Sequence, residues 1–403
     1  MRETSRLGDV TEFVLDGTHG SPIRTEIGIP VLSAQNVTDG QLSYQTDRFT
    51  SLDEYHAFSR RVAIQPGDLL LTIVGTIGRA AIVDRVRPAV FQRSVSIIRP
   101  SNGRLESRYF LHVTQSAEFK RQLASATNGS TQGGVYLGKL KQIELHLPPL
   151  DEQRRLAAIL DRADFLRHLR AKTIQRLVSL KQSTFVSMFG DPLSAPNNWP
   201  MKTLSSVCLA INDCPHTTPR WTDSGVTCLR TSNLTEGDWN WQDHRFVSEA
   251  EHHARSKRGY LEMGDIVLSR EGTVGIAAIV PHGLTASMGQ RLVQVRANPS
   301  AIEPNYLLQF LLGALSPSRI TRVMVGSTSH HLNLKDLRAL RVPVPPLGIQ
   351  AEFAKRMHVV RETTSVSTRA QMDCELLFTS LQHRTFNGEL TAKAAERELA
   401  EVG

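Results

Sequence analysis

Apolar side chains recur at every third or fourth position in two long stretches of the chain, which is the pattern of one buried face on a helix. The first stretch covers residues 151–188 and ends at Gly-Asp-Pro, a sequence that terminates helices. The second covers about residues 348–388 and is less regular, because TTSVSTRAQ at 363–371 is poor helix-forming sequence. The apolar positions of the two faces are Leu156, Ile159, Leu166, Leu177, Leu180, Phe185, Phe353, Met357, Leu377, Leu381 and Phe386.

Each of these helices is too long to serve only as a packing helix of one domain. A helix of about 38 residues spans roughly 57 Å at ~1.5 Å per residue. Neither helix can bury its apolar face alone, and the chain has to return. We therefore predict that the two helices pair antiparallel as a coiled coil and act as a spacer.

The rest of the chain is an internal repeat, because the sequence matches itself with a shift of 197 positions. DGTHGSP at 16–22 matches DCPHTTP at 213–219, and GDLLLTIVGTIGRAAIV at 67–83 matches GDIVLSREGTVGIAAIV at 264–280. After a slip of one or two residues, the segment 129–153 matches 326–350. A repeat this long predicts two copies of one folded unit rather than a solenoid of short repeats.

Each copy mixes strand and helix signals. Short apolar or alternating runs such as LLLTIV and SVSII, punctuated by Gly and Pro, predict strands, while residues 109–126 and 306–315 have helical spacing. We expect an α+β protein, in which two similar α/β domains with a pseudo-twofold relation are separated by the two long helices. The predicted division is a first domain at 1–149, a central helix at 150–190, a second domain at 191–346, a C-terminal helix at 347–390 and a tail at 391–403.

Composition and the absence of targeting patterns add three expectations. Lys and Arg total 47 against 39 Asp and Glu, a net charge of +8, which suits a polyanionic partner without proving one. The four cysteines lack CxxC spacing and are expected to be free thiols. The sequence contains no signal-peptide pattern and no apolar run long enough for a membrane span, so we expect a cytosolic protein that does not engage a membrane.

The order of motifs resembles that of the specificity subunits of type I restriction-modification enzymes. DCPHTTP, GDLLLT followed by GTIG, and LPPLDEQRRLAAILD are soft motifs individually, but this order occurs twice at a fixed shift. The resemblance covers nearly the whole chain. One departure is the GIQ at 348–350, which replaces the acidic DEQ at 151–153 and leaves the start of the second long helix without matching carboxylates.

The resemblance implies a non-catalytic, DNA-binding role. Each domain, termed a target-recognition domain in this family, would read one half of a bipartite DNA target through the major groove, and the helices would fix the distance between the halves. The helices would also dock two methyltransferase subunits, which methylate adenine with S-adenosylmethionine, and a restriction and translocation subunit would use ATP and Mg. No cofactor, metal or catalytic residue is implied for this chain.

Candidate DNA-binding residues are polar or basic side chains in predicted loops, since bases are read by donors and acceptors and phosphates by Lys and Arg. Gln92-Arg93 and Gln290-Arg291 occupy matched positions, whereas Arg230 and Arg270 replace Ser33 and Ile73 of the first copy, as expected if the two domains read different sequences. The full set is His19, Gln92, Arg93, Ser130, Thr131, Gln132, His216, Arg230, Arg270, Gln290, Arg291, His330 and His331.

Other chemical signals have simpler interpretations. His19 and His216 lie in Thr- and Pro-rich turns without a partner nucleophile, so a hydrogen-bonding turn role is favoured over catalysis. Zinc binding by Cys208, Cys214, His216 and Cys228 is disfavoured because the first copy lacks these cysteines. The GTIG and GTVG segments do not continue to the GK[ST] of a phosphate loop, and neither Pro-Pro pair forms the [DN]PP[YFW] motif of a methyltransferase. Trp239 and Trp241 suit packing better than base stacking.

Two rival functions remain open from the sequence. One is an assembly or decoy protein that docks a methyltransferase without reading DNA. The other, more remote, is an enzyme with an unrecognised active site.

Overall fold

The computed structural model describes residues 4–127, 133–191, 199–316, 319–320 and 332–400. The chain forms two compact units: unit 1 comprises residues 1–171 and 369–403, and unit 2 comprises residues 172–368. The helices α5 (Leu150–Phe189) and α11 (Leu347–Phe386) therefore each contribute one part to unit 1 and one part to unit 2. Among the described residues, no helix has the length and apolar character needed to cross a membrane.

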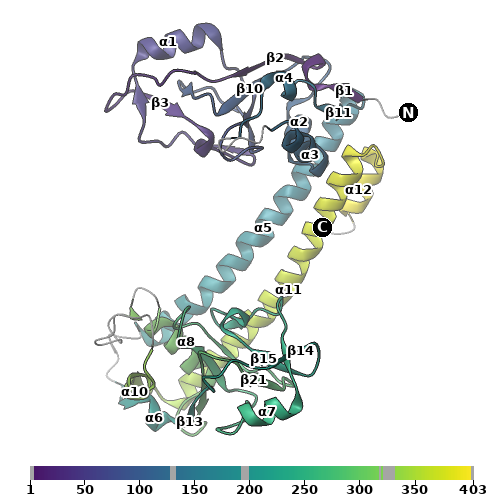
Figure 1. The fold of residues 1–403 in the computed structure, drawn as a ribbon. Helices are drawn as coiled ribbons and strands as arrows, with labels where there is room; N and C mark the ends of the chain where they lie inside the picture. The colour runs from purple at the N-terminus through teal and green to yellow at the C-terminus, as the bar shows by residue number, and fades with distance from the viewer. Residues whose placement is uncertain (1–3, 128–132, 192–198, 317–318, 321–331, 401–403) are drawn as a thin grey trace. The chain divides into compact units, whose positions relative to one another are not determined.

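Unit 1 is built on a four-stranded antiparallel sheet with the order β2-β10-β7-β8. Two of its strands, β2 and β10, are labelled in Figure 1. The strand bounds are β2 Thr11–Asp16, β10 Val95–Pro100, β7 Leu69–Thr72 and β8 Ala80–Ile82. All residues of β7 are buried, which explains why LLLT reads as a continuous apolar run instead of an alternating one. Helices α2 (Ser107–Gln115) and α3 (Ala117–Ser125) follow β10 in the chain.

Smaller sheets complete unit 1. Strand β3 pairs antiparallel with β6 and parallel with β9, β4 pairs with β5, and β1 pairs with β11. The remaining elements are β1 Thr4–Arg6, β3 Ile29–Leu32, β4 Val37–Thr38, β5 Gln41–Leu42, β6 Phe49–Thr50, α1 Leu52–Arg61, β9 Val90–Phe91, α4 Leu137–Leu140 and β11 Glu144–His146, with short 3-10 turns at Leu7–Asp9 and Ala34–Asn36.

Unit 2 repeats this topology and adds one strand, β14, which pairs antiparallel with β18. Its main sheet has the order β13-β22-β19-β20, and β15 pairs antiparallel with β18 and parallel with β21. The elements are β12 Met201–Thr203, α6 Leu204–Val207, β13 Cys208–Asp213, β14 Trp221–Thr222, β15 Val226–Leu229, β16 Leu234–Thr235, β17 Asp238–Trp239, β18 Phe246–Val247, α7 Glu249–Arg255, β19 Ile266–Ser269, β20 Ala277–Ile279, β21 Ala286–Met288, β22 Leu292–Ala297, α8 Pro304–Ala314, α10 Leu334–Ala339 and β23 Arg341–Pro343, with a 3-10 turn at Thr231–Asn233. The predicted α+β class and internal repeat are confirmed.

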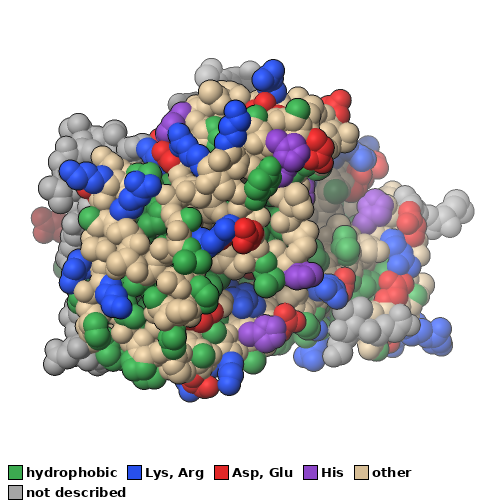
Figure 2. Space-filling view, turned by 90° about the horizontal axis from the view of Figure 1, so that it is seen from below, with side chains coloured by type: hydrophobic (Ala, Val, Ile, Leu, Met, Phe, Trp, Pro, Cys, Tyr) green, Lys and Arg blue, Asp and Glu red, His purple; other side chains and the backbone are tan. Residues whose placement is uncertain are grey.

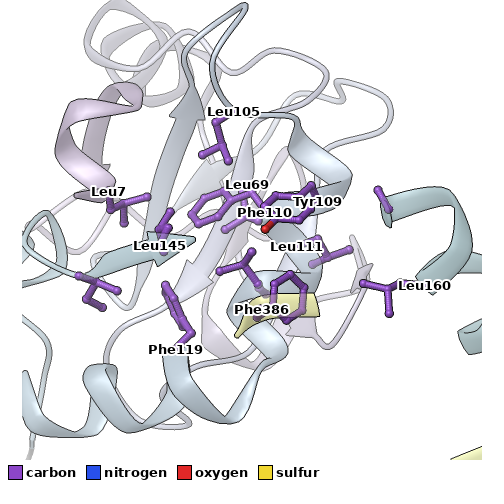
Figure 3. Close-up of a cluster of buried hydrophobic side chains, with 14 of the residues drawn as sticks. Leu7, Leu69, Leu105, Tyr109, Phe110, Leu111, Phe119, Leu145, Leu160 and Phe386 are labelled. Carbon is purple, nitrogen blue, oxygen red and sulfur yellow. The ribbon is translucent and has the colours of Figure 1, made fainter. Parts of the chain in front are cut away.

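The core of unit 1 joins the sheet to both long helices. Figure 3 shows Tyr109 and Phe110 of α2 and Phe119 of α3 clustered with Phe386 from the end of α11, and the same buried cluster includes Leu160 of α5. The ring centroids of Tyr109 and Phe386 lie 5.5 Å apart. The C-terminal part of the chain therefore completes the core of the N-terminal domain.

The two helices run antiparallel within each unit. In unit 1, Glu152 accepts a hydrogen bond from the backbone N of Ala392, and Arg167 pairs with Glu375 at 3.1 Å. Later residues of α5 therefore contact earlier residues of the C-terminal segment. In unit 2, Phe185 and Phe189 of α5 both contact Phe353 of α11, with ring centroids 5.6 and 5.4 Å apart. The predicted antiparallel pairing is confirmed.

Three local features differ from the sequence-based expectation. The segment 363–371 is helical throughout, and the hydroxyls of Thr363 and Thr364 donate to the carbonyls four residues earlier, which accommodates them in α11. The helix expected at 109–126 is interrupted, because Ser116 ends α2 and caps α3 with its hydroxyl. The tail contains a further helix, α12 (Ala392–Ala400), whose Ala392 and Ala395 are buried in unit 1.

The same joint connects each domain to its long helix. Gln153 accepts from the backbone N of Glu106 at 2.9 Å and donates to the carbonyl of Pro148, and the matched Gln350 makes the same bonds to Glu303 and Pro345. Gln153 and Gln350 are both buried. The Gln of DEQ and GIQ is thus the residue that both joints require, which explains how Gly348 and Ile349 can replace the acidic pair of the first copy.

Candidate nucleic-acid interface

Three turns of unit 2 meet at one edge of its main sheet. One turn follows β13, one follows β19 and one precedes β22. The C-terminal ends of β13 and β19 lie beside the N-terminal end of β22, because β22 runs antiparallel to both neighbours. Backbone hydrogen bonds join them: the N of Cys214 donates to the carbonyl of Leu292, and the N of Arg270 donates to the carbonyl of Arg291. The edge therefore gathers four candidates, His216, Arg270, Gln290 and Arg291, from three separate places in the sequence.

Charged side chains are linked along this edge. Arg270, almost fully buried, donates from one nitrogen to both carboxylate oxygens of Asp213 at 2.6 Å. The same carboxylate contacts the ring of His216 at 3.1 Å. On the other side, Glu271 lies 3.4 Å from the guanidinium of Arg291, whose side chain is 59% exposed. The edge thus has a buried charge pair beneath exposed His and Arg side chains.

Unit 1 forms the matching edge with different chemistry. The ring of His19 lies 2.9 Å from Asp16, as in unit 2, and Arg61 donates to the backbone carbonyls of Asp16 and Gly17 at 2.7 and 2.6 Å. Ile73 and Val74 replace the Arg and Glu that follow β19. In both units the turn histidine is exposed and hydrogen-bonded to the Asp that ends the strand.

The matched pairs Gln92-Arg93 and Gln290-Arg291 lie in the turns that precede β10 and β22, respectively. In unit 1 the backbone N of Arg93 donates to the carbonyl of Thr18, so this turn sits against the His19 turn, and Arg93 is exposed. In unit 2 the side-chain amide of Gln290 donates to the carbonyl of His216 at 2.8 Å. Gln92 is half-buried and bridges to Thr18 through the backbone.

Arg230 lies beside this edge, since the residue before it accepts a hydrogen bond from the backbone N of Gly289. Its guanidinium is paired with Asp243 and lies 5.9 Å from the centre of the Trp221 ring. Hydrogen bonding from Arg230 lowers the pKa of Asp243 below its usual value. Arg230 is therefore engaged within the unit as well as next to the candidate surface.

Trp239 and Trp241 stack on each other, with ring centroids 5.3 Å apart and planes inclined by 20°. The indole N of Trp239 donates to the carbonyl of Ile279 at 2.7 Å, which ties that ring to the main sheet. Trp241 is 37% exposed. Trp239 is thus a packing residue, and Trp241 covers it.

The remaining candidates lie outside the described residues. These are Ser130, Thr131 and Gln132 in unit 1 and His330 and His331 in unit 2. Described residues that follow them in the chain lie at the same edges. The backbone N of Val135 donates to the carbonyl of Ile73, and that of Leu332 donates to the carbonyl of Arg270, both at 2.9 Å.

Among the cysteines of unit 2, Cys214 and Cys228 are buried and Cys208 is half-buried. Burial raises the pKa of Cys228 to about 11 and that of Cys208 to about 12, and it also raises the pKa of Cys214. Thiols with such pKa values are mostly protonated near neutral pH and are poor nucleophiles and metal ligands. Within the described ranges, no cluster of three or more His, Cys, Asp or Glu side chains could hold a metal ion.

Asp16, Asp213 and Glu271 were not among the residues predicted from the sequence, although these carboxylates hold basic residues of the two edges. The fixed shift that matches Asp16 with Asp213 was the available signal. Basic residues are not confined to these edges. Figure 2 shows Lys and Arg side chains scattered among other types on the face it presents.

Comparison with known proteins decides the family. The family model for the type I restriction modification DNA specificity domain matches residues 2–178 and again residues 196–372. This chain belongs to that family and carries its domain twice. The resemblance inferred from the motif order is confirmed.

Relatives span the whole length of the chain. The type I restriction enzyme MjaVIII specificity subunit of Methanocaldococcus jannaschii is 20% identical over 97% of this chain and 93% of its own length. The EcoKI specificity subunit of Escherichia coli K12 is 22% identical over 91% and 83%. The solved S subunit of a type I system from M. genitalium has the same fold, with a TM-score of 0.60 and 14% identity over 96% of both chains.

The expected helix residues divide into two groups by burial. Leu156, Ile159, Phe185, Phe353, Met357, Leu381 and Phe386 are buried within the two units. Leu166, Leu177 and Leu377 are half-buried, and Leu180 is 45% exposed. The buried group packs inside this chain and is not accessible to a partner.

Proposed function

We propose that this chain is the sequence-specific DNA-binding subunit of a type I restriction-modification complex. Each unit binds one half of a bipartite target, and the complex methylates adenine or cuts DNA through other subunits. The chain itself supplies recognition and no catalytic step. The observation that carries this proposal is the duplicated unit whose sheet edge keeps its backbone while its charged residues change.

The sheet edges suit base recognition because they combine donors, acceptors and exposed cations on turns held by backbone hydrogen bonds. Preformed turns lose little conformational freedom on binding. Reading requires side chains that differ between the two halves of an asymmetric target, and Arg270 and Glu271 opposite Ile73 and Val74 supply such a difference. The candidate DNA-binding residues, including those outside the described residues, are proposed on this basis.

Partner docking is proposed for the exposed apolar positions of the long helices. On α5, Phe165 and Leu169 are 57% and 47% exposed and lie four residues apart, on one helix face. On α11, Met372 and Leu376 are 56% and 70% exposed with the same spacing. Exposed apolar rows of this kind mark interaction surfaces. We propose that they receive two methyltransferase subunits, which use S-adenosylmethionine, and that a restriction subunit using ATP and Mg joins the assembly.

The domain division proposed for this function is two target-recognition domains at residues 1–149 and 191–346, with spacer helices at 150–190 and 347–390. An assembly or decoy protein is the alternative, because a docking surface needs no DNA reading.

Selection from a library of random DNA duplexes separates the two. The full chain, purified with its methyltransferase partner, is expected to enrich a motif of two fixed parts separated by a gap of constant length. Recovery of the assembled complex without any enriched motif would establish the decoy function instead.

The spacer role has its own test in the same selection. Four residues inserted after Arg170 add about one helical turn, roughly 6 Å. We expect the gap in the enriched motif to change while both parts stay the same. A gap of unchanged length would refute the spacer role but leave DNA reading intact.

A further inference from the structure

The turn that precedes β22 in unit 2 holds a side chain in an unusual backbone conformation. Arg291 has φ = 69° and is the one non-glycine residue with positive φ among those that the structure describes. A long side chain is rarely placed in this left-handed region, where glycine is favoured because it has no Cβ. Such conformations cluster at functional sites, where the surrounding structure holds them.

The neighbouring backbone fixes this turn on both sides. The N of Gly289 donates to the carbonyl of Leu229 at 2.7 Å, and the carbonyl of Arg291 accepts from the N of Arg270 at 3.0 Å. A Cβ at Gly289 would lie 2.6 Å from the carbonyl oxygen of Leu229, so only glycine fits there. The turn therefore presents Arg291 from a rigid frame.

Two of the other three candidates at this edge, Gln290 and Arg270, are already committed to internal contacts. The amide of Gln290 donates to the carbonyl of His216, and the guanidinium of Arg270 is held by both oxygens of Asp213 with only 8% of its side chain exposed. Turning either side chain outward would leave a polar group of the edge without its partner, which is costly. These two residues position the turns.

Arg291 is different because its guanidinium is exposed and has the carboxylate of Glu271 within 3.4 Å. An exposed ion pair of this kind contributes little to stability and exchanges readily. The carboxylate of Glu271 orients the guanidinium of Arg291 in the free protein, and a DNA base can replace it as the partner. A guanidinium fork matches the O6 and N7 acceptors of guanine in the major groove, which is the commonest base-specific contact.

We propose that Arg291 reads a guanine in the half-target bound by unit 2, while Gln290 and Arg270 hold the turns that present it. This inference rests on the proposed function and adds the residue, the base and the division of roles. Unit 1 lacks this arrangement of a positive-φ Arg beside a Glu. Val74 stands in place of Glu271, and Arg93, which matches Arg291, does not have a positive φ. The guanine contact is therefore specific to one half of the target.

The test uses Arg291→Gly and Arg291→Lys in the full chain with its methyltransferase partner, with random DNA duplexes as the probe. Arg121→Ala is the control, because Arg121 is also exposed and paired with a nearby Glu, at a site outside the edge. For Arg291→Gly we expect preference for guanine at one position of one half to fall about 10- to 100-fold, with the other positions unchanged. The melting temperature is expected to rise by about 2–4 °C, because glycine relieves the left-handed backbone.

Arg291→Lys keeps the charge and loses the fork. It should lose the same base preference while the salt dependence of binding stays that of the unchanged chain. Selection of the original motif by both variants would overturn the inference. So would an equal loss of affinity for all sequences with a reduced salt slope, which would make Arg291 a phosphate contact. If the unchanged chain enriches no motif, the proposed function fails first.

Discussion

Units 1 and 2 share their internal framework and differ at the edge they expose. In unit 1, Arg99 donates to both oxygens of the buried Asp68 at 2.7 and 2.8 Å, and in unit 2 Arg296 makes the same pair with Asp265 at 2.8 and 2.9 Å. The equivalent joints through Gln153 and Gln350 also share two hydrogen bonds, one from a backbone N of the domain and one to a proline carbonyl.

The exposed edges do not match in this way. Arg270 and Glu271 of unit 2 correspond to Ile73 and Val74 of unit 1, so one edge is charged and the other largely apolar at the same backbone positions. The two units share the residues of their internal framework and differ at the edge for which DNA binding is proposed. This contrast favours the edge as the recognition surface more sharply than basic charge does, because Lys and Arg are scattered over the face shown in Figure 2.

Removal of the buried carboxylate should produce the largest effect, and the same effect in either unit. Asp68→Ala and Asp265→Ala each leave an arginine without its buried partner, which should cost about 3 kcal/mol of unfolding free energy. All four tryptophans lie in unit 2, so urea unfolding followed by Trp fluorescence reports that unit alone, and circular dichroism reports both.

We expect Asp265→Ala to shift the fluorescence transition and Asp68→Ala to shift only the dichroism. Equal fluorescence shifts for the two variants would show that the buried ion pair of unit 1 also stabilises unit 2.

The C-terminal segment sharpens the comparison, because it completes unit 1 only. Leu390 is buried there and precedes α12, whereas in unit 2 Trp199 packs on Phe189 at the corresponding end of α5. Leu390→Ala should cost about 2 kcal/mol, at the low end for a buried leucine because the site is close to the chain end. The loss should be seen by circular dichroism with no change in the fluorescence transition, and a shift in fluorescence would refute the assignment of α12 to unit 1.

The two units also differ where the helix after the main sheet contacts α5 or α11; in unit 1 this is the contact between α2 and α5. Asp161 contacts the buried ring of His112 at 2.8 Å and Arg108 at 3.0 Å, whereas unit 2 has Gln309 and Asn305 at the positions of His112 and Arg108. Burial alone would raise the pKa of Asp161, but the hydrogen bonds from His112 and Arg108 lower it below 3.8. The ionised carboxylate is therefore the stabilising form.

A depressed pKa gives stability that is present above the ordinary value and lost as pH falls through the folded value. Asp161→Asn should cost about 1 kcal/mol at pH 7, and the difference from the unchanged chain should shrink as the pH falls through the lowered pKa of Asp161. Melting curves of both proteins over a series of falling pH values measure it, with the exposed Asp151→Asn as the control. A difference that stays the same at every pH at which both proteins remain folded would mean that the carboxylate charge is not what stabilises this contact.

The smallest effect is expected where the two units already show that a substitution is tolerated. Cys228 is buried in unit 2 at the position of Val31 in unit 1. Cys228→Val should change the unfolding free energy by less than about 0.5 kcal/mol, because volume and burial are conserved. A change in the unfolding free energy several times larger, detected by Trp fluorescence, would mean that the thiol stabilises unit 2 in a way that Val31 of unit 1 does not indicate.

The repeat made the fold predictable, because two sequences that align over most of their length and keep Asp68, Asp265, Gln153 and Gln350 have to form the same unit. The long helices were predictable from the spacing of their apolar residues. The helix α12 was not, because AKAAERELA has only small apolar residues and a final Leu to mark a buried face.

The contacts of the candidate edge were predictable only in part. Residue types and matched positions brought out His216, Arg270 and Arg291. Sequence could not separate the buried Arg270 from the exposed Arg291. The fold brings Asp213 to Arg270 and Glu271 to Arg291, in each case from a different turn. The positive φ of Arg291 likewise follows from the turn geometry.

The most direct measurement of the central claim is an exchange of one recognition domain. Residues 1–149 are replaced by the corresponding domain of another family member whose target is known, and the DNA motif selected by the complex is compared with that of the unchanged chain. The account predicts that one part of the motif becomes that of the donor while the other part and the gap persist. A motif altered in both parts, or unaltered in both, would contradict the view that each unit reads its own half.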